Sequence, residues 1–230
     1  MRKIFVMIFI LFVILVFNIY GLEEERLTEA IEMMIIRETA RSDDLYQKLI
    51  ALEFIEDNIN RSNYEYSGRY NYTEIVLELE FLYLDAIENH RDIPNFTYIR
   101  LRVAILLGEI GNEEAKNVLF LILQNDNEEI VLVYALRSLN KIRINDNGQT
   151  IANIVLCFNR NYIIDGILNP HIALAAIDAL GNIARQSKII LDSGAMGILS
   201  FISLENQYER RVRERAKVEY EYWLFIINNN

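Results

Sequence analysis

Apolar side chains recur every three to four residues along most of the chain, with polar side chains between them. In the first such stretch after residue 22, the apolar positions are Leu27, Ala30, Ile31, Met34 and Ile35. This spacing places them on one face of a helix. No stretch alternates apolar and polar residues strictly enough to favour a β-strand over a helix. The pattern therefore predicts an all-α protein, with helices over residues 22–39, 45–59, 74–89, 97–110, 113–124, 128–142, 149–159, 170–186, 194–204 and 209–227.

A five-residue pattern recurs at the end of alternate helices. Residues 106–110 read LLGEI, residues 138–142 read SLNKI and residues 179–183 read ALGNI. Aligning these helices brings one set of large apolar residues into register, and a smaller residue follows each of them four positions later. The large residues are Ile99, Val131, Ile172 and Val212, and the smaller ones are Val103, Ala135, Ala176 and Ala216. A supersecondary unit that recurs in this way is typical of stacked helical repeats, in which small residues let neighbouring helices approach closely.

One segment lacks the helical spacing. Residues 61–72 contain four tyrosines and are predicted to form a loop. Such a loop could be a binding surface, because tyrosine rings offer both an apolar face and a hydroxyl group, or it could cover a helical pair. The segment separates a predicted N-terminal hairpin, residues 22–60, from the repeats of residues 73–230. We interpret residues 22–230 as a single helical-repeat domain.

The N-terminus has a different character. Arg2 and Lys3 precede an unbroken apolar run over residues 4–17, and residues 23–25 are all glutamate. A basic start, an apolar centre and a polar continuation are typical of an export signal, here residues 1–21.

Two interpretations of that signal remain open. Gly21 is the one small residue where cleavage of a signal peptide would be expected, and the apolar run is slightly shorter than the roughly 20 residues that span a bilayer. The segment is either a cleaved signal peptide or an inner-membrane anchor formed by residues 4–20. Both interpretations predict an exported protein, periplasmic or secreted, with no contact to the membrane beyond this segment.

The charge of the chain narrows the class of partner. It carries 33 acidic and 23 basic residues, a formal net charge of −10. Such a surface repels nucleic acids and anionic bilayers. The one clear basic cluster is in the last predicted helix, where Arg210, Arg211, Arg213, Arg215 and Lys217 alternate with glutamates. It is either a solvated helix face with internal ion pairs or a site for an acidic partner.

No recognisable catalytic, metal or cofactor motif is present in the sequence. His90 and His171 have no second ligand-type residue at metal-binding spacing, so we predict no metal, no cofactor and no catalytic residues. Cys157 is the only cysteine and lies in an apolar helical run. We interpret it as a buried, unreactive side chain.

The repeats resemble two known families. The residues Ile99-Arg100 followed by LGEIGNEEA over residues 107–115 resemble a HEAT repeat of the short, bacterial kind. Residues 179–196 resemble an armadillo repeat. The resemblance implies a right-handed α-solenoid of about five stacked helical hairpins, in which a concave face built by the second helices holds other proteins. Peptide-binding armadillo proteins carry a ladder of Asn residues, each with Trp four positions earlier; here Asn182 follows Asp178, so that ladder is absent.

These observations lead to one function hypothesis with two alternatives. We predict an exported, non-catalytic scaffold that binds a protein partner on the face of the second helices. The alternatives are an envelope component that self-associates through its tyrosine-rich loop, and an enzyme with a pocket in the solenoid. The candidate partner-binding residues are Arg102, Glu109, Arg137, Lys141, Asp178 and Asn182.

Overall fold

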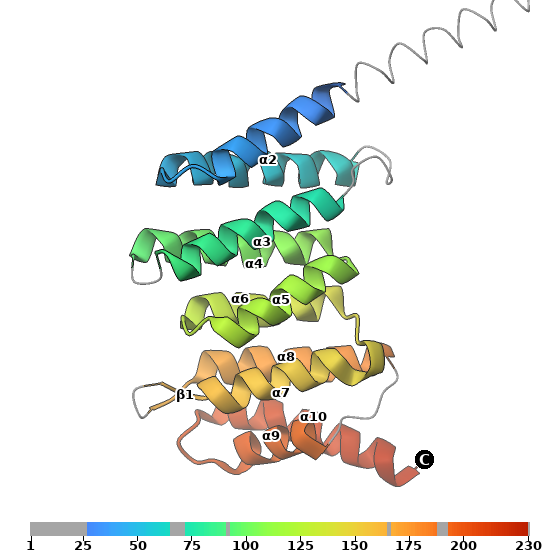
Figure 1. Ribbon diagram of the computed structural model, residues 1–230. Coiled ribbons are helices and arrows are strands. Elements are labelled where there is room, and N and C mark those ends of the chain that lie inside the picture. The colour runs from blue at the N-terminus through green and yellow to red at the C-terminus, as the bar shows by residue number, and fades with distance from the viewer. Residues whose placement is uncertain (1–26, 65–71, 91–92, 165–166, 188–192, 230) are drawn as a thin grey trace, which may run out of the picture. The chain divides into compact units, whose positions relative to one another are not determined.

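The structure is a computed structural model that describes residues 27–64, 72–90, 93–164, 167–187 and 193–229. These residues are predominantly helical, and the helices pack against one another, which confirms the all-α prediction (Figure 1). Residues 27–40 are helical. The helices that follow are α2 (Leu45–Tyr64), α3 (Tyr72–Glu88), α4 (Pro94–Ile110), α5 (Glu113–Asn125), α6 (Glu129–Ile142), α7 (Gln149–Asn161), α8 (Pro170–Ser187), α9 (Ser193–Leu204) and α10 (Arg210–Asn229).

The largest differences from the predicted helix boundaries are at the end of α2 and the start of α4. Helix α2 continues to Tyr64, so the first four residues of the predicted tyrosine-rich loop are helical; residues 65–71 lie outside the described residues. Helix α4 begins at Pro94 instead of at residue 97. Proline fits the first position of a helix because no backbone N–H is needed there and its φ is already helical. Ile93 before it is extended, as expected for a residue that precedes proline.

The prediction of no strand was wrong at one turn. Between α7 and α8, β1 (Ile163–Ile164) pairs antiparallel with β2 (Ile167–Leu168). The backbone N–H of Asn169 continues this pairing with a 2.8 Å hydrogen bond to the carbonyl oxygen of Tyr162. Strands of two residues are too short to show an alternating pattern, so the sequence could not reveal them.

Asparagine and aspartate side chains set the helix starts. The Asn112 side chain accepts a hydrogen bond from the N–H of Ala115 at the start of α5 (2.8 Å), and Asn169 accepts from the N–H of Ile172 at the start of α8 (2.9 Å). Gly111, at the end of α4, has φ +72°, a left-handed conformation that glycine adopts at little cost. The polar turns predicted from the sequence therefore act as helix caps.

The chain divides into two compact units, residues 1–54 and residues 55–230, with the boundary inside α2. In the described part of unit 1, the helix of residues 27–40 is joined to α2 by a short turn. Asp44 caps α2 by accepting a 2.7 Å hydrogen bond from the N–H of Tyr46. The buried ammonium group of Lys48 donates to the carbonyl oxygen of Ala40 (2.9 Å), which ties the two helices of this unit together.

In unit 2, alternate helices contact one another. Helix α4 packs on α6, α6 on α8 and α8 on α10, while α5 packs on α7 and α7 on α9. Two layers result, and their order can be followed in Figure 1. All eight residues of the predicted register are buried, as expected for the contacts between neighbouring helices: Ile99, Val103, Val131, Ala135, Ile172, Ala176, Val212 and Ala216.

A network of polar contacts around a buried ion pair joins several helices at one turn. Arg100 and Asp126 are both fully buried, and the Arg100 Nε donates to Asp126 Oδ2 at 2.9 Å. The other carboxylate oxygen of Asp126 accepts from the N–H of Glu128 at 3.0 Å, just before α6. From α7, Arg160 donates to the carbonyl oxygens of Leu123 (2.7 Å) and Asp126 (2.8 Å). These contacts hold α4, α6 and α7 to the C-terminal end of α5.

Among the described residues, no helix is both long and apolar enough to cross a membrane. The predicted export signal, residues 1–21, lies outside the described residues.

Candidate functional site

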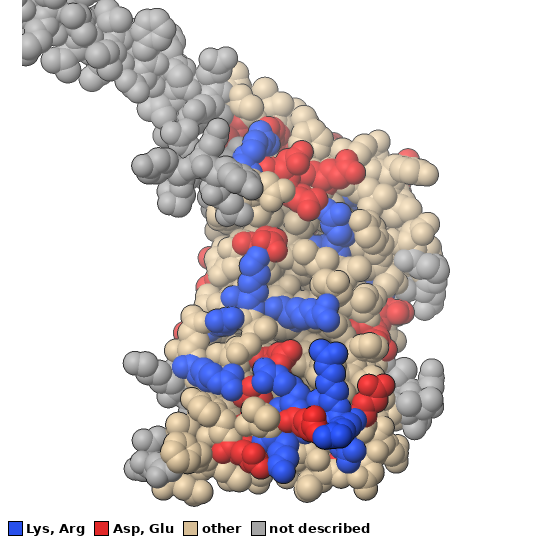
Figure 2. Space-filling model, turned by 180° about the vertical axis from the view of Figure 1, so that it is seen from behind, with Lys and Arg blue, Asp and Glu red and all other residues tan. Residues whose placement is uncertain are grey.

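The six candidate residues lie on three neighbouring helices of one layer. Helix α4 contributes Arg102 and Glu109, α6 contributes Arg137 and Lys141, and α8 contributes Asp178 and Asn182. All six side chains are exposed or half-buried. Figure 2 shows a face on which basic and acidic side chains are interspersed over the lower half of the view. The candidate residues therefore belong to a polar surface, which we call the α4–α10 face, formed by α4, α6, α8 and α10.

Contacts between neighbouring helices join most of these residues into a row. Lys141 of α6 forms an ion pair with Glu109 of α4. The Asn182 amide of α8 donates to the side-chain oxygen of Asn140 in α6, at 3.1 Å. Arg215 of α10 pairs with Asp178 of α8, with 2.9 Å between Nε and Oδ1. Four of the six candidate residues thus take part in contacts that run across four helices, with Asn140 and Arg215 as partners that the sequence did not predict.

Arg102 takes no part in these contacts, because its partners are Glu56 and Tyr98. It pairs with Glu56 and also donates to the hydroxyl of Tyr98 at 3.0 Å. Burial by itself would lower the pKa of Arg102. The hydrogen bond to Tyr98 and the charge of Glu56 outweigh this effect, so the pKa is raised above its usual value. Its guanidinium is held by these two partners and is less available to a ligand than an unpaired one.

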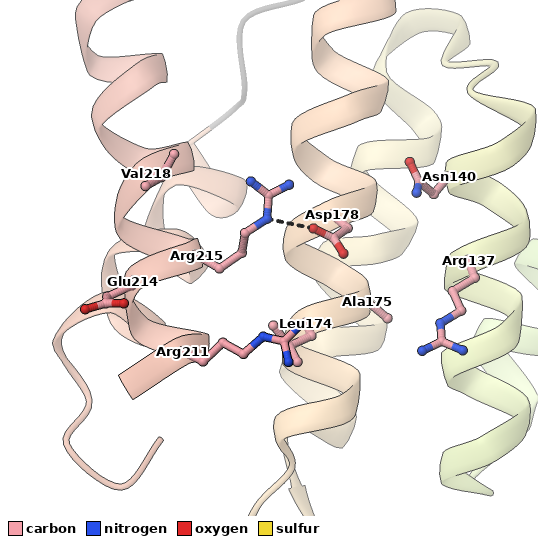
Figure 3. A pocket seen from close by; sticks show the side chains of 9 residues that line it. All are labelled: Arg137, Asn140, Leu174, Ala175, Asp178, Arg211, Glu214, Arg215 and Val218. Carbon is pink, nitrogen blue, oxygen red and sulfur yellow. Dashed lines mark hydrogen bonds and ion pairs between the residues drawn. The ribbon is translucent and has the colours of Figure 1, made fainter. Parts of the chain in front are cut away.

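A pocket of about 460 Å³ opens between α6, α8 and α10 (Figure 3). It is lined by Arg137, Asn140, Leu174, Ala175, Asp178, Arg211, Glu214, Arg215 and Val218. Two of the six candidates, Arg137 and Asp178, therefore line it. In Figure 3, Arg137 reaches from α6 and Arg211 from α10, so that the two guanidinium groups flank α8.

Sequence reasoning missed the α10 side of this pocket. Arg211, Glu214 and Arg215 were noticed only as members of a basic cluster with two interpretations. A signal was available, because Arg215 follows Val212 by three positions, as Arg102 follows Ile99. The register already included Val212, and counting three positions on from it would have placed Arg215 on the same face as Arg102.

Ion pairs take up several charges around the pocket. Arg210 pairs with Glu214 at 2.6 Å, which confirms the helical ion pair expected from their spacing. The buried carboxylate of Glu219 is contacted by Arg185 and, at 2.9 Å, by Arg215. The hydrogen bond to Glu219 is the largest cause that raises the pKa of Arg185.

A second pocket lies on the other layer, between α7 and α9. Its volume is about 300 Å³, and its aromatic walls include Phe158, Tyr162 and Phe201. The rings of Phe158 and Tyr162 are stacked, with centroids 5.4 Å apart, and Phe201 meets Tyr162 edge-on at 5.5 Å. This pocket contains no charged group among its lining residues.

Neither histidine lies in these pockets. His90 is stacked on Phe96, with 3.9 Å between ring centroids, and its Nε2 is 4.0 Å from Asp85. His171 is 4.0 Å from Glu129. In the part of the chain that the structure describes, no three His, Cys, Asp or Glu side chains come together as metal ligands.

Cys157 is buried, as predicted from its apolar surroundings. Burial raises the pKa of its thiol to about 11, because a thiolate would lose its hydration there. The thiol therefore stays protonated near neutral pH and is a poor nucleophile.

Comparison with protein-family models, with curated proteins and with solved structures gives no match for this chain. The fold and the pocket define only a class: an all-helical protein with a charged surface pocket between packed helices. The resemblance to HEAT and armadillo repeats stays a prediction.

Proposed function

We propose that this protein is an exported, non-catalytic scaffold that binds a protein partner on the α4–α10 face of a right-handed α-solenoid. The solenoid is supported by the recurrence of the same helix-to-helix contact, α4 to α6, α6 to α8 and α8 to α10, through residues in the same repeat register. Export is supported by the basic and apolar N-terminal segment.

The observation that carries the proposal is the pocket of the α4–α10 face. It lies between α6, α8 and α10, which are neighbours in one layer but not in the sequence. Its lining combines arginines, carboxylates and the apolar side chains of Leu174, Ala175 and Val218. Surfaces that recognise proteins typically combine an apolar centre with a polar rim, and arginine is enriched in them.

Crosslinking from defined positions tests this proposal. A photoreactive amino acid replaces Lys141 or Val218 on the α4–α10 face, or Ala152 of α7 in the other layer; all three positions are exposed. After irradiation of cells that produce the full chain, we expect the same crosslinked protein species from positions 141 and 218 and none from position 152. Mass spectrometry identifies the species.

Two outcomes would contradict the proposal. Equal crosslinking from all three positions would mean that the α4–α10 face has no special role. Crosslinks only to further copies of the chain would favour the alternative of a self-associating envelope component.

A further inference from the structure

The charges of the pocket between α6, α8 and α10 do not cancel within the described residues. Asp178 is paired with Arg215, and Glu214 is paired with Arg210, which stands outside the lining. In the part of the chain that the structure describes, Arg137 and Arg211 take part in no ion pair. Both are exposed, and both line the pocket. The Arg137 guanidinium lies over the ring of Tyr134 in its own helix, with 5.1 Å from Cζ to the ring centroid.

The start of α10 adds positive potential at the same place. The helix begins with Arg210 and Arg211, and its first turn contains no acidic residue. Unpaired N–H groups already give a helix N-terminus a partial positive charge, so cations there destabilise the helix. Glu209 directly before the helix offsets only part of this charge. A helix that places arginines where they are unfavourable is better explained by a ligand than by stability.

The neutral groups of the pocket specify the ligand further. The Asn140 side-chain oxygen accepts from Asn182, which leaves its amide nitrogen as a further donor in the lining of the pocket. Leu174, Ala175 and Val218 offer apolar contact beside these donors. Glutamate and aspartate side chains combine a carboxylate, which arginine binds in a bidentate manner, with an apolar stem. A volume of about 460 Å³ admits a short peptide stretch.

The rest of the chain disfavours dense polyanions. The net charge of −10 and the two carboxylates in the lining repel a nucleic-acid backbone more strongly than a peptide with a few spaced carboxylates.

We infer that this pocket binds an acidic peptide segment of the protein partner, with Arg137 and Arg211 receiving its carboxylates from the two sides of α8. The inference rests on the proposed function and names the chemistry of its partner.

Fluorescence anisotropy with a labelled hexaglutamate peptide tests the inference on the full chain, at a salt concentration of about 50 mM to limit screening. Hexaglutamine serves as the uncharged control peptide. The variants are R137Q and R211Q, each of which removes one positive charge from the pocket. K217Q is the matched control, because exposed Lys217 lies on the same helix, pairs with Glu221 at 3.6 Å and does not line the pocket.

We expect hexaglutamate to bind and hexaglutamine not to bind. R137Q and R211Q should each weaken binding about three- to tenfold, the range for losing one exposed charge-assisted contact, and K217Q should leave it unchanged. Equal weakening by K217Q would show that hexaglutamate is attracted non-specifically, and this would overturn the inference. If hexaglutamate does not bind at all, the inference is also overturned. Displacement by inorganic phosphate or a single-stranded oligonucleotide at lower concentration than by unlabelled hexaglutamate would also overturn it, because the pocket would then select phosphate.

The crosslinking and the anisotropy experiments test the scaffold function and the acidic segment independently. Crosslinks that come selectively from positions 141 and 218 without any hexaglutamate binding would leave the scaffold function standing and reject the acidic segment. Hexaglutamate binding without selective crosslinks would reject the scaffold function.

Discussion

At the scale of single residues, two glycines mark where neighbouring helices approach most closely. A Cβ atom on Gly108 would lie 2.4 Å from the Ser138 hydroxyl oxygen and 3.1 Å from the Ser138 Cα. A Cβ atom on Gly181 would lie 2.6 Å from the carboxylate of Glu219. Both glycines stand at the same position of the repeat, nine residues after Ile99 and Ile172. The recurring glycine of the sequence pattern is therefore a packing requirement between successive helices.

Alanine substitution at these glycines should test this requirement through the sign of the change in the free energy of unfolding. Gly108→Ala gains about 1 kcal/mol of helix propensity, but overpacking against a backbone atom costs about 1–3 kcal/mol, so we expect a net loss of stability. Gly197→Ala in α9 is the matched control, because nothing lies within 4 Å of its new Cβ; we expect a gain of about 0.5–1 kcal/mol. Urea unfolding followed by circular dichroism measures both. Changes in the same direction would contradict the close approach of α4 and α6.

At the scale of elements, the junction between α5 and α6 depends on a buried charge pair. Arg100 lies in the second turn of α4, and Asp126 lies in the loop 26 residues later, where it also accepts from the N–H groups of Asn127 and Glu128. A buried pair of this kind adds little over apolar residues, but removal of one partner leaves an uncompensated charge. The pair therefore favours one packing of α4 against the following hairpin, because another packing would leave a buried charge without its partner.

Breaking the pair from one side should be more costly than neutralising both sides. Arg100→Met leaves the Asp126 carboxylate buried without its guanidinium, and we expect a loss of about 3–5 kcal/mol. Asparagine at position 126 keeps an oxygen that can accept from the N–H of Glu128. We therefore expect the double variant Arg100→Met, Asp126→Asn to recover part of that loss. The free energy of unfolding of the single and double variants is the measurement, and additive losses would show that the two side chains are not coupled.

At the scale of the whole molecule, we predict separate roles for the N-terminal segment and for the packed helices. The helices of unit 2 contain the polar face and the pocket, whereas the apolar run of residues 4–17 is predicted to direct export. The export prediction comes from the order of charge and hydrophobicity alone, since residues 1–26 lie outside the described residues. It leads to a test that does not depend on the fold.

Lysines in the apolar run should abolish export. Replacing Val13 and Leu15 with lysine places two charges where each costs about 2.5–3.5 kcal/mol on insertion. Protease added to intact, wall-stripped cells should degrade the unaltered chain and leave this variant untouched, while both are degraded after lysis. Replacing Asn18 with lysine, just beyond the run, is the control and should not prevent export. Protection of the unaltered chain would refute the prediction.

The sequence by itself determined the helices, most of their boundaries and the buried register. These features depend on neighbours a few residues apart: the spacing of apolar side chains, the asparagine and aspartate caps, and the small residues at Ala135, Ala176 and Ala216. It also placed Arg137 and Asp178 on one face, because helical register carries across repeats.

Only the tertiary structure decided how charges pair and where the pocket opens. Asp178 meets Arg215 across 37 residues, and Glu219 is buried beneath Arg185 across 34. Such partners are chosen by the offset between packed helices, which local patterns do not encode. For the same reason Arg137 and Arg211, alike in the sequence to paired arginines, were left without a carboxylate among the described residues. The short β1–β2 pairing also depended on the turn that two packed helices enclose.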